Sequence, residues 1–309
     1  MYLMDITIIG AGAVGGYFGA RLYESGARVT LVARGETLRA VRERGVRVTD
    51  ARGAREVAVP VVGSLHEVER ADVVLVATKA LGGGTPPQEL FDGLPRTAIV
   101  ATTQNAVEAP HQAAGIVGSA RVWPGVVRGF FIHTGPASVE YRGGPLSYTF
   151  GTWDRSAPDP VRQLAAEFCA ALNTAGIEGR AHPGIWVDVW EKAMFVTTFG
   201  GLGAFVDKPL GVLRTDYRST LEALMREVAD VARADGVALP RDAVERTMMF
   251  ADRMPEASTS SMQRDIAAGG DSELDAQVGA IVRAGKRHGV DVRLHDLIFT
   301  ALRNRGPNR

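Results

Sequence analysis

The fold is indicated most clearly by the stretch Asp5-Ile6-Thr7-Ile8-Ile9-Gly10-Ala11-Gly12-Ala13-Val14-Gly15-Gly16. Residues 5–9 form a short apolar run rich in β-branched side chains, which is typical of a buried strand. The glycines follow at once, and helix-compatible residues then continue through Tyr23 to a stop at Gly26. A strand, a Gly-x-Gly-x-x-Gly turn and a helix in this order predict a dinucleotide site. Its phosphates would lie on the helix N-terminus.

The groups expected to bind the cofactor here belong to the turn and the first helical residues: Gly10, Gly12, Ala13, Val14 and Gly15. Glycine allows the backbone to approach a pyrophosphate closely, and the first helical amides supply donors. A purely structural glycine-rich turn is the alternative.

The rest of the first half alternates strands with other segments. Residues 28–33, 71–77 and 97–102 are continuous apolar runs rather than alternating ones, which favours a parallel sheet covered on both faces. Residues 121–153 mix aromatic and β-branched residues with glycines, and they predict short antiparallel strands at the edge of that sheet.

From Pro158 onward the apolar residues recur at helical spacing. The expected helices include 185–199, 220–234, 241–252 and 273–288, and Pro183-Gly184 is a candidate boundary. We therefore expect an α/β Rossmann domain over residues 1–180 and a mostly helical substrate and catalytic domain over residues 181–309. A ligand is expected in the crevice between them.

Composition excludes several classes of protein. The chain of 309 residues has 35 basic and 35 acidic residues, so no net charge favours nucleic acid or an anionic membrane as partner. The one cysteine, Cys169, cannot form an intrachain disulfide or a thiolate metal site, and the six histidines lack ligand spacing, so no metal is expected. With no apolar run near the roughly 20 residues of a membrane span and no signal-peptide pattern, we expect a soluble cytoplasmic protein.

The end of the second predicted strand indicates which cofactor is bound. Arg34 follows this strand, where a cation would hold the 2′-phosphate of NADP. Glu36 lies close enough to leave NAD open, and a solvated arginine is the structural alternative. The sequence favours NADPH.

Polar residues also follow the third and fourth strands. Lys79 comes after the third, and Gln104-Asn105 after the fourth. Open α/β sheets bind ligands at the carboxyl ends of their strands, so Lys79 could meet a phosphate or carboxylate and Asn105 a ribose or substrate. A surface lysine and a turn-forming asparagine are the structural alternatives.

Three residues of the helical half complete the candidates. Lys192 lies in a helix rich in aromatic residues, where partial desolvation would make it a usable general acid, unless it merely pairs with Asp188 one turn earlier. Ser261 and Glu273 could bind substrate, or could be a helix cap and a first-turn acid. The local pattern does not decide between these roles.

Taken together, these motifs resemble the ketopantoate reductase (2-dehydropantoate 2-reductase) family. The glycine turn, Lys79, Gln104-Asn105, Trp190-x-Lys192, Ser260-Ser261-Met262 with Asp265, and Glu273 occur in the family's order across nearly the whole chain. The resemblance implies a Rossmann domain and a helical domain like that of 6-phosphogluconate dehydrogenase. It also implies reduction of a 2-oxo acid by NADPH, as in 2-dehydropantoate to pantoate for pantothenate biosynthesis.

The resemblance also implies a role for each residue. Lys192 would be the general acid that protonates the developing alkoxide, Glu273 would bind substrate near the reacting carbonyl and also contact the cofactor, and Ser261 would bind the substrate carboxylate. Negative charge builds on the ketone oxygen during hydride transfer, so a fixed ammonium suits that position.

The remaining roles concern the cofactor. By the same resemblance, Asn105 would contact substrate or the nicotinamide side, Lys79 an anionic group of cofactor or substrate, and Arg34 the 2′-phosphate.

The chain departs from the family pattern at three positions. Ala106 replaces a glycine, and Val196 and Gly200 stand where the family has asparagines four and eight residues after the lysine. Loss of such polar partners can cost a polar substrate about 1–3 kcal/mol each. A paralogous reductase of a less polar oxo substrate and a catalytically silent NADPH-binding protein are therefore alternatives.

A third alternative, an amine-condensing dehydrogenase, rests on fold analogy alone. Exposed apolar positions in the helical half permit a homodimer without demonstrating one.

Overall fold

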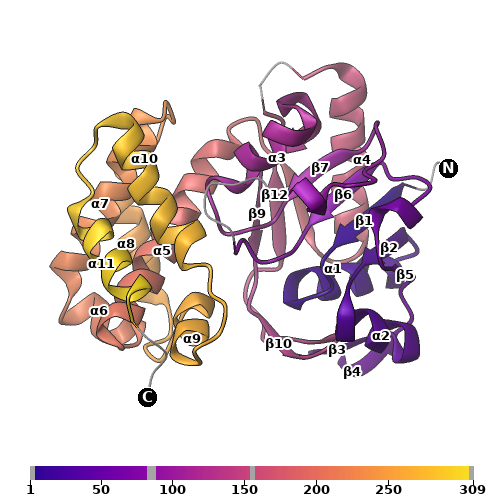
Figure 1. Cartoon of the computed structure of the whole chain (residues 1–309), viewed down its shortest axis with the longest axis horizontal. Helices are drawn as coiled ribbons and strands as arrows, with labels where there is room; N and C mark the ends of the chain where they lie inside the picture. The colour runs from indigo at the N-terminus through magenta and orange to yellow at the C-terminus, as the bar shows by residue number, and fades with distance from the viewer. Residues whose placement is uncertain (1–3, 82–87, 154–156, 306–309) are drawn as a thin grey trace. The chain divides into compact units, whose positions relative to one another are not determined.

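A computed structural model describes residues 4–81, 88–153 and 157–305 of the chain, which form two compact units (Figure 1). The described parts of the first unit are 4–79, 88–104, 109–153 and 157–185. Those of the second are 80–81, 105–108 and 186–305. Two short segments that follow strands of the first unit thus belong to the second unit. The two units are therefore not two continuous stretches of chain.

The centre of the first unit is a six-stranded sheet in the order β5-β2-β1-β6-β7-β8, with every neighbouring pair parallel. Its strands are β1 (Asp5–Ile9), β2 (Arg28–Val32), β5 (Val61–Val62), β6 (Val73–Val76), β7 (Ile99–Thr102) and β8 (Val122–Trp123). Counted along the chain this is the order 3-2-1-4-5-6, that of a Rossmann sheet. The strand order reverses between β1 and β6.

Apolar cores cover both faces of this sheet. Ile6 and Ile8 of β1 pack in one core with Phe18 of α1, whereas Ile9 packs in another with Ala113 of α3. Burial on both faces explains why these strands are continuous apolar runs. The helices of this unit are α1 (Ala13–Glu24), α2 (Gly35–Arg44), α3 (Ala109–Val117) and α4 (Asp159–Thr174), with 3₁₀ turns η1 (Leu65–Glu67), η2 (Gln88–Leu90) and η3 (Ser119–Arg121).

The expectation for residues 121–153 is wrong in its placement. Only β8 lies at the edge of the main sheet, and it pairs there in parallel. The other strands form two small sheets, ordered β10-β11-β3-β4 and β13-β12-β9. Their bounds are β3 (Val46–Asp50), β4 (Gly53–Val57), β9 (Gly125–Arg128), β10 (Phe131–Gly135), β11 (Ser138–Tyr141), β12 (Ser147–Phe150) and β13 (Glu178–Ala181). Within the segment β10 pairs with β11 and β9 with β12, both antiparallel as predicted, whereas the further partners β3, β13 and β7 lie outside it. Local composition indicates a strand but not all of its partners.

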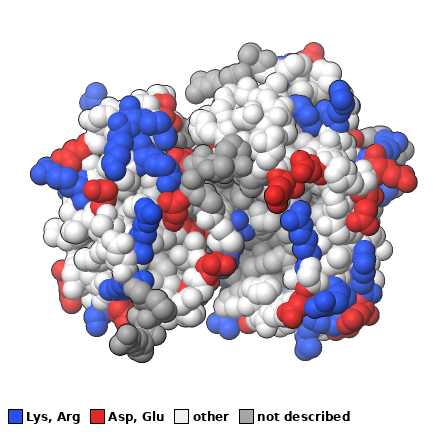
Figure 2. Space-filling model, viewed as in Figure 1, with Lys and Arg blue, Asp and Glu red and all other residues white. Residues whose placement is uncertain are grey.

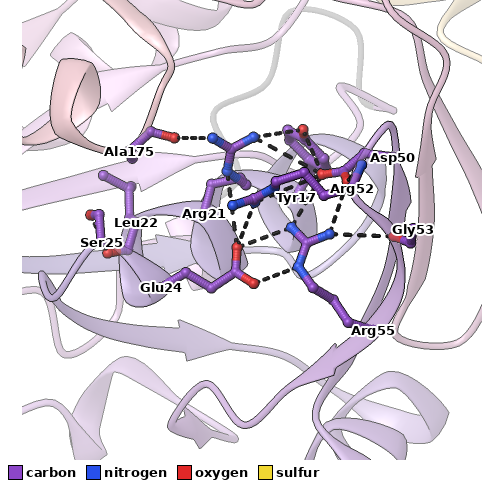
Figure 3. Close-up of polar contacts among 10 residues, drawn as sticks. All are labelled: Tyr17, Arg21, Leu22, Glu24, Ser25, Asp50, Arg52, Gly53, Arg55 and Ala175. Carbon is purple, nitrogen blue, oxygen red and sulfur yellow. Dashed lines mark hydrogen bonds and ion pairs between the residues drawn. The ribbon is translucent and has the colours of Figure 1, made fainter.

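A network of charged side chains joins the end of α1 to the β3–β4 hairpin (Figure 3). The Arg55 guanidinium donates to both carboxylate oxygens of Glu24, and its Nη1 and Nη2 donate to Asp50 at 2.9 and 3.1 Å. Arg21 of α1 donates to the carbonyl oxygen of Ala175, just after α4. The network therefore holds α1, the hairpin and the end of α4 together.

The same contacts favour the ionised carboxylates. The hydrogen bond from Arg55 lowers the pKa of Glu24, against the opposing effect of burial. Burial acts to raise the pKa of Asp50, but hydrogen bonds from Arg55 and the Arg52 amide outweigh it, and the pKa of Asp50 is also lowered. A carboxylate with a depressed folded-state pKa stabilises the fold above its unfolded pKa, near 4, and this contribution is lost as the pH falls through the folded value.

We expect Asp50→Asn to lower the free energy of unfolding by about 1–3 kcal/mol at pH 7, because charge-assisted hydrogen bonds to a buried group are lost. The deficit should shrink toward zero in strong acid, where the native Asp50 is also protonated. Urea unfolding of both proteins at pH 7 and about pH 2 measures it. Glu140→Gln, at the exposed pair with Arg142, is the control and should have a small effect. An equal deficit at both pH values would contradict the charge assignment.

The second unit is built from helices. Its described helices are α5 (Ile185–Val206), α6 (Leu210–Thr215), α7 (Arg218–Ala234), α8 (Ala243–Arg253), α9 (Ser261–Ala267), a π-helical segment η4 (Asp275–Gly279), α10 (Ala280–His288) and α11 (Arg293–Arg303). The buried face of α7 is central and contacts α6, α8, α10 and α11. This confirms the predicted fold class, a Rossmann sheet followed by a mostly helical unit.

The surface carries charges of both signs. Figure 2 shows Lys and Arg side chains interspersed with Asp and Glu, in keeping with 35 residues of each sign. Lys and Arg side chains gather where α10 lies (Figure 2). The last turn of this helix contains Lys286, Arg287 and His288. Within the described ranges, no helix has the length and hydropathy of a membrane span.

Candidate functional site

The glycine turn lies at the point where the order of the main sheet reverses. A Cβ on Gly10, whose φ is +96°, would lie 2.9 Å from Thr78 Cγ2 in the loop after β6. A Cβ on Gly15 would lie 1.9 Å from the Gly10 carbonyl oxygen and 2.9 Å from Ala77 Cβ. The loops after β1 and β6 are thus pressed together with no room for side chains, as a Rossmann phosphate turn requires.

Gly12 differs from the other two glycines of the motif. A Cβ there would meet no heavy atom of the described structure within 4 Å, so the turn leaves open space beside its backbone. Gly12 is the N-cap of α1, which has no side-chain cap among the described residues and no acidic residue in its first turn. The first-turn amides of Ala13, Val14 and Gly15 thus form a helix N-terminus suited to an anion.

Arg34 lies at the N-terminus of the next helix. It is the exposed N-cap residue of α2, directly after β2 and Ala33, and Gly35 follows with φ +55°. Glu36, in the first turn of α2, is also exposed. Both charged residues are therefore available at the strand end, and the fold alone does not choose between them.

The loops after β6 and β7 are held together by side chains. Thr103 Oγ1 donates to the Val76 carbonyl oxygen at 2.8 Å, and Gln104 Nε2 lies 3.4 Å from Thr78 Oγ1. Lys79 is exposed at the end of the first of these loops. The chain then passes from each loop into a segment of the second unit, at Ala80 and at Asn105.

Asn105 carries an unsatisfied polar atom. Its side-chain Oδ1 is buried and accepts no hydrogen bond from the described residues. Buried polar atoms are nearly always hydrogen-bonded, so this acceptor beside a strand end could accept a hydrogen bond from a ligand. Three residues further, Glu108 is also buried, and Arg283 Nη2 donates to its Oε2 at 2.7 Å.

Glu273 is a buried, hydrogen-bonded candidate in the second unit. It is 8% exposed, and its Oε1 accepts from the Ala80 amide at 3.0 Å. Its Oε2 accepts from Gln277 Nε2 at 3.2 Å. The backbone directly after Lys79 therefore fixes this carboxylate, although 193 residues separate the donor from the acceptor.

Lys192 lies in the first half of α5, half-buried between the buried residues Trp190 and Ala193. Met194 is fully buried beyond it. Partial burial excludes water from part of the residue, which strengthens the field of its ammonium group on any nearby charge.

Ser261 is exposed at the first position of α9. The cap of this helix is Ser260, whose Oγ accepts from the Gln263 amide at 2.9 Å. The helix-cap alternative for Ser261 is therefore wrong. Its hydroxyl is not used to cap α9.

The positions four and eight residues after Lys192 differ in surroundings. Val196 is half-buried, while a Cβ on Gly200 would lie 2.8 Å from Met262 Cε and 2.9 Å from Ser260 Oγ. The start of α9 thus packs directly on the backbone of α5. A larger side chain at residue 200 would require Ser260 and Met262 to move.

The candidates divide between the two units. The glycine turn, Arg34 and Lys79 belong to the first, whereas Asn105, Lys192, Ser261 and Glu273 share the second. Among the residues that the structure describes, no group of three or more His, Cys, Asp or Glu side chains is arranged to hold a metal.

Two polar partners of the site were not predicted. Gln277 bonds Glu273, and Arg283 pairs with Glu108. The signal available in the sequence was a single charge within an apolar stretch, as in Ala106-Val107-Glu108-Ala109 and Ile281-Val282-Arg283-Ala284. Buried charges are paired, so two such isolated charges of opposite sign are candidates for one contact.

A Rossmann sheet with a glycine turn at its switch point, followed by a helical unit, defines a class of two-domain nucleotide-dependent oxidoreductases. Family models agree in both halves: "Ketopantoate reductase PanE/ApbA" matches residues 6–155, and "Ketopantoate reductase PanE/ApbA C terminal" matches residues 185–306. The chain is also 32% identical over 324 residues to 2-dehydropantoate 2-reductase of Halobacterium salinarum, covering 97% of this chain and 100% of that protein. The chain belongs to the ketopantoate reductase PanE/ApbA family, as its motifs predicted, and is an oxidoreductase of that family.

Solved structures show the same fold. A PanE/ApbA family ketopantoate reductase from Ralstonia eutropha superimposes with a TM-score of 0.85 at 27% identity, with 97% of both chains covered. The structure of D-mandelate dehydrogenase with NADH and anilino(oxo)acetate gives a TM-score of 0.83 at 23% identity, with 97% of both chains covered. The second likeness concerns the fold alone.

Proposed function

We propose that this protein reduces a 2-oxo acid to the 2-hydroxy acid with NADPH, and that 2-dehydropantoate, which would yield pantoate, is its substrate. The observation that carries the proposal is the buried Glu273 carboxylate, fixed by the Ala80 amide in a unit that also contains Lys192 and the orphaned acceptor of Asn105. Ordered polar groups of this kind are what a polar substrate needs for orientation.

The first unit supports binding of the dinucleotide. The open space at Gly12 and the uncapped first turn of α1 fit a pyrophosphate, and Gly10 and Gly15 leave no side chain in its way. Arg34 would hold the 2′-phosphate. When bound, NADPH supplies a hydride to the carbonyl carbon of the substrate.

The second unit supports the substrate chemistry. Lys192 Nζ would hydrogen-bond the ketone oxygen, stabilise the negative charge that develops there, and donate a proton to it. Glu273 would accept a hydrogen bond from the substrate or product hydroxyl and touch the cofactor. Ser261 would donate to the substrate carboxylate.

Two further residues would bind polar groups. Asn105 would use its buried amide on the substrate or the nicotinamide side, where its Oδ1 can accept a hydrogen bond. Lys79, exposed at the end of its strand loop, would neutralise an anionic group of cofactor or substrate.

We expect Arg34→Ala to raise the KM for NADPH by about 10- to 100-fold, because a charge-assisted hydrogen bond is worth about 1.5–3 kcal/mol. The kinetic constants with NADH should change little, since NADH has no 2′-phosphate. Steady-state kinetics with both cofactors measure this. Arg39→Ala, an exposed arginine on the same helix, is the control. Equal losses with both cofactors would exclude the 2′-phosphate role.

A specific observation favours a second candidate substrate, a less polar 2-oxo acid. Val196 offers no hydrogen bond, and the space beside Gly200 holds Ser260 and Met262. An asparagine at residue 200 would clash there, so this chain has no room for an amide side chain at residue 200 and offers none at residue 196. A substrate with a branched or aromatic side chain would lose no hydrogen bond to water on contact with Val196 or Met262.

The experiment measures the turnover of a panel of substrates through the loss of NADPH absorbance. It compares 2-dehydropantoate with the matching branched 2-oxo acid that lacks the hydroxyl, and with phenylglyoxylate, since the fold is shared with D-mandelate dehydrogenase. Highest kcat/KM with 2-dehydropantoate supports the proposal, and highest kcat/KM with either other acid supports the second candidate. NADPH binding without turnover would support a catalytically silent protein, and an amine-dependent rate would indicate the condensing reaction.

A further inference from the structure

A part-buried ion cluster in the second unit, centred on the buried Glu108, has no part in the proposed chemistry. Glu108 is 9% exposed and accepts from Arg283 through Nη2 at 2.7 Å and through Nε at 3.2 Å. Arg287 Nη1 adds a contact to Glu108 Oε1 at 3.2 Å. Both arginines lie on α10, whereas Glu108 belongs to the short segment that follows β7.

The Arg283 guanidinium also donates hydrogen bonds to a second segment. Arg283 Nη1 donates to Asp275 Oδ1 at 3.0 Å, and its Nη2 donates to the Asp275 carbonyl oxygen at 3.0 Å. Asp275 begins the π-helical segment η4, two residues after Glu273. One planar group with its donors in a fixed fork therefore joins two pieces of chain that are distant in sequence.

These two pieces carry candidate polar groups of the site. Asn105, with its orphaned Oδ1, lies three residues before Glu108, and Glu273 lies two residues before Asp275. The Ala80 amide donates a hydrogen bond to Glu273, whereas no described residue donates one to the side-chain oxygen of Asn105. The Glu108–Arg283 contact is what links the Asn105 segment to the start of η4.

Stability alone does not account for such a cluster. Desolvation largely cancels the attraction within a buried ion pair, and apolar replacements are often as stable. Burial acts to lower the pKa of Arg283, yet the bonds to Glu108 and Asp275 outweigh it, and the pKa is raised. Such a pair instead fixes the geometry of the two chain segments that it joins.

We propose that Arg283, held by Glu108, is a positioning residue that sets the Asn105 amide relative to the Glu273 carboxylate. This inference rests on the proposed function, because Asn105 and Glu273 are the groups that would orient the oxo acid. Arg283 itself touches neither substrate nor cofactor in this account. Its effect passes through the two segments that it joins.

The test compares Arg283→Met, Glu108→Gln, their double variant and Arg283→Lys with Arg214→Met. Arg214 is a matched control, since it is part-buried in the same unit, donates to the carbonyl oxygens of Ala251, Asp252 and Met254, and lies 3.5 Å from the exposed carboxylate of Glu256. A misplacement of about 1 Å costs about 100-fold in rate. We expect Arg283→Met to lower kcat/KM for the oxo acid by about that factor, with the KM for NADPH within about twofold of wild type.

Three comparisons separate positioning from a merely structural role. The double variant should be little worse than Arg283→Met, because the Glu108–Arg283 contact is already lost in that variant and only the contact of Glu108 with the exposed Arg287 is broken in addition. Arg283→Lys should recover only part of the rate, since an ammonium lacks the fork. Arg214→Met should lower the melting temperature without changing kcat or KM. Wild-type kinetics in Arg283→Met, or losses of kcat in Arg214→Met equal to those in Arg283→Met, would overturn the proposal.

A second readout keeps this result apart from the proposed function. If wild-type protein reduces no 2-oxo acid, the function fails, but the side-chain amide signals of Asn105 in an NMR spectrum still report its position. The proposal then expects these signals to shift in Arg283→Met and Glu108→Gln and to stay in place in Arg214→Met. Unshifted Asn105 signals in Arg283→Met would overturn it.

Discussion

Replacement of Lys192 by alanine is expected to lower kcat by about 10³-fold while NADPH remains bound with nearly unchanged affinity. A general acid contributes about 10²- to 10⁴-fold, and loss of a group that stabilises the developing oxyanion has a cost of similar size. Lys192 lies half-buried on α5, in the unit separate from the glycine turn, so its removal leaves the proposed phosphate groups in place.

The measurement combines turnover with a titration of NADPH fluorescence. Lys286→Ala removes an exposed lysine of the same unit and is the control, with kcat expected at the wild-type value. Turnover by Lys192→Ala at the wild-type rate would exclude the general-acid role. Parallel losses of turnover and of NADPH affinity would also contradict it, since they would indicate a role in binding the cofactor.

Two glycine substitutions three residues apart are expected to have opposite consequences. In Gly15→Ala the new methyl group would lie 1.9 Å from the Gly10 carbonyl oxygen, which is backbone and cannot swing away. Overpacking of this kind costs about 3 kcal/mol or more, so the turn should open and the first unit should lose stability. NADPH binding should be lost with it.

Gly12→Ala should instead fold normally. The added methyl meets no described atom within 4 Å, and the backbone there, at φ −80° and ψ −154°, suits alanine. The methyl would occupy space assigned to the pyrophosphate, so the Kd for NADPH should rise by about 10-fold or more, as a clash of 1–3 kcal/mol implies. Thermal unfolding and fluorescence titration of both variants test this. Equal stability of the two variants, or wild-type NADPH affinity in Gly12→Ala, would contradict the assignment.

The central strands of the main sheet and their parallel arrangement could be predicted from the sequence because the signals are local. A continuous apolar run, a glycine turn and a helix specify β1 and α1, and the strands at 71–77 and 97–102 show a continuous apolar run as well. Each of these strands is buried on both faces, so composition alone reflects its environment. The family resemblance then extended the prediction over the helical half.

The small sheets could not be predicted in this way. β11 pairs with β3, more than eighty residues earlier, and β12 pairs with β13, beyond α4. Strand-forming residues at 121–153 are compatible with several partners, and tertiary packing makes the choice. The predicted helix over 273–288 likewise contains a π-helical turn at Asp275–Gly279 that was not predicted. One extra residue in a helical turn scarcely alters the apolar pattern of the sequence.

The candidate site shows a similar division. Glu273 and Asn105 were singled out by their motifs, but their present environments depend on contacts that no short pattern encodes. The Ala80 amide reaches Glu273 across 193 residues, and Arg283 reaches Glu108 across 175. Ser260, rather than Ser261, caps α9, a difference of one position that only the backbone conformation decides.

The central claim is hydride transfer to the carbonyl carbon of a 2-oxo acid by this chain. The most direct measurement uses NADPH carrying deuterium at the transferred position, purified protein and 2-dehydropantoate, with the product analysed by mass spectrometry. The two diastereotopic positions of the cofactor are labelled in separate reactions. We expect pantoate one mass unit heavier, labelled at C2, in one of the two reactions, and no labelled product with Lys192→Ala on the same timescale. NADPH bound tightly by the wild-type protein, with unlabelled or no reduced acid in either reaction, would contradict it.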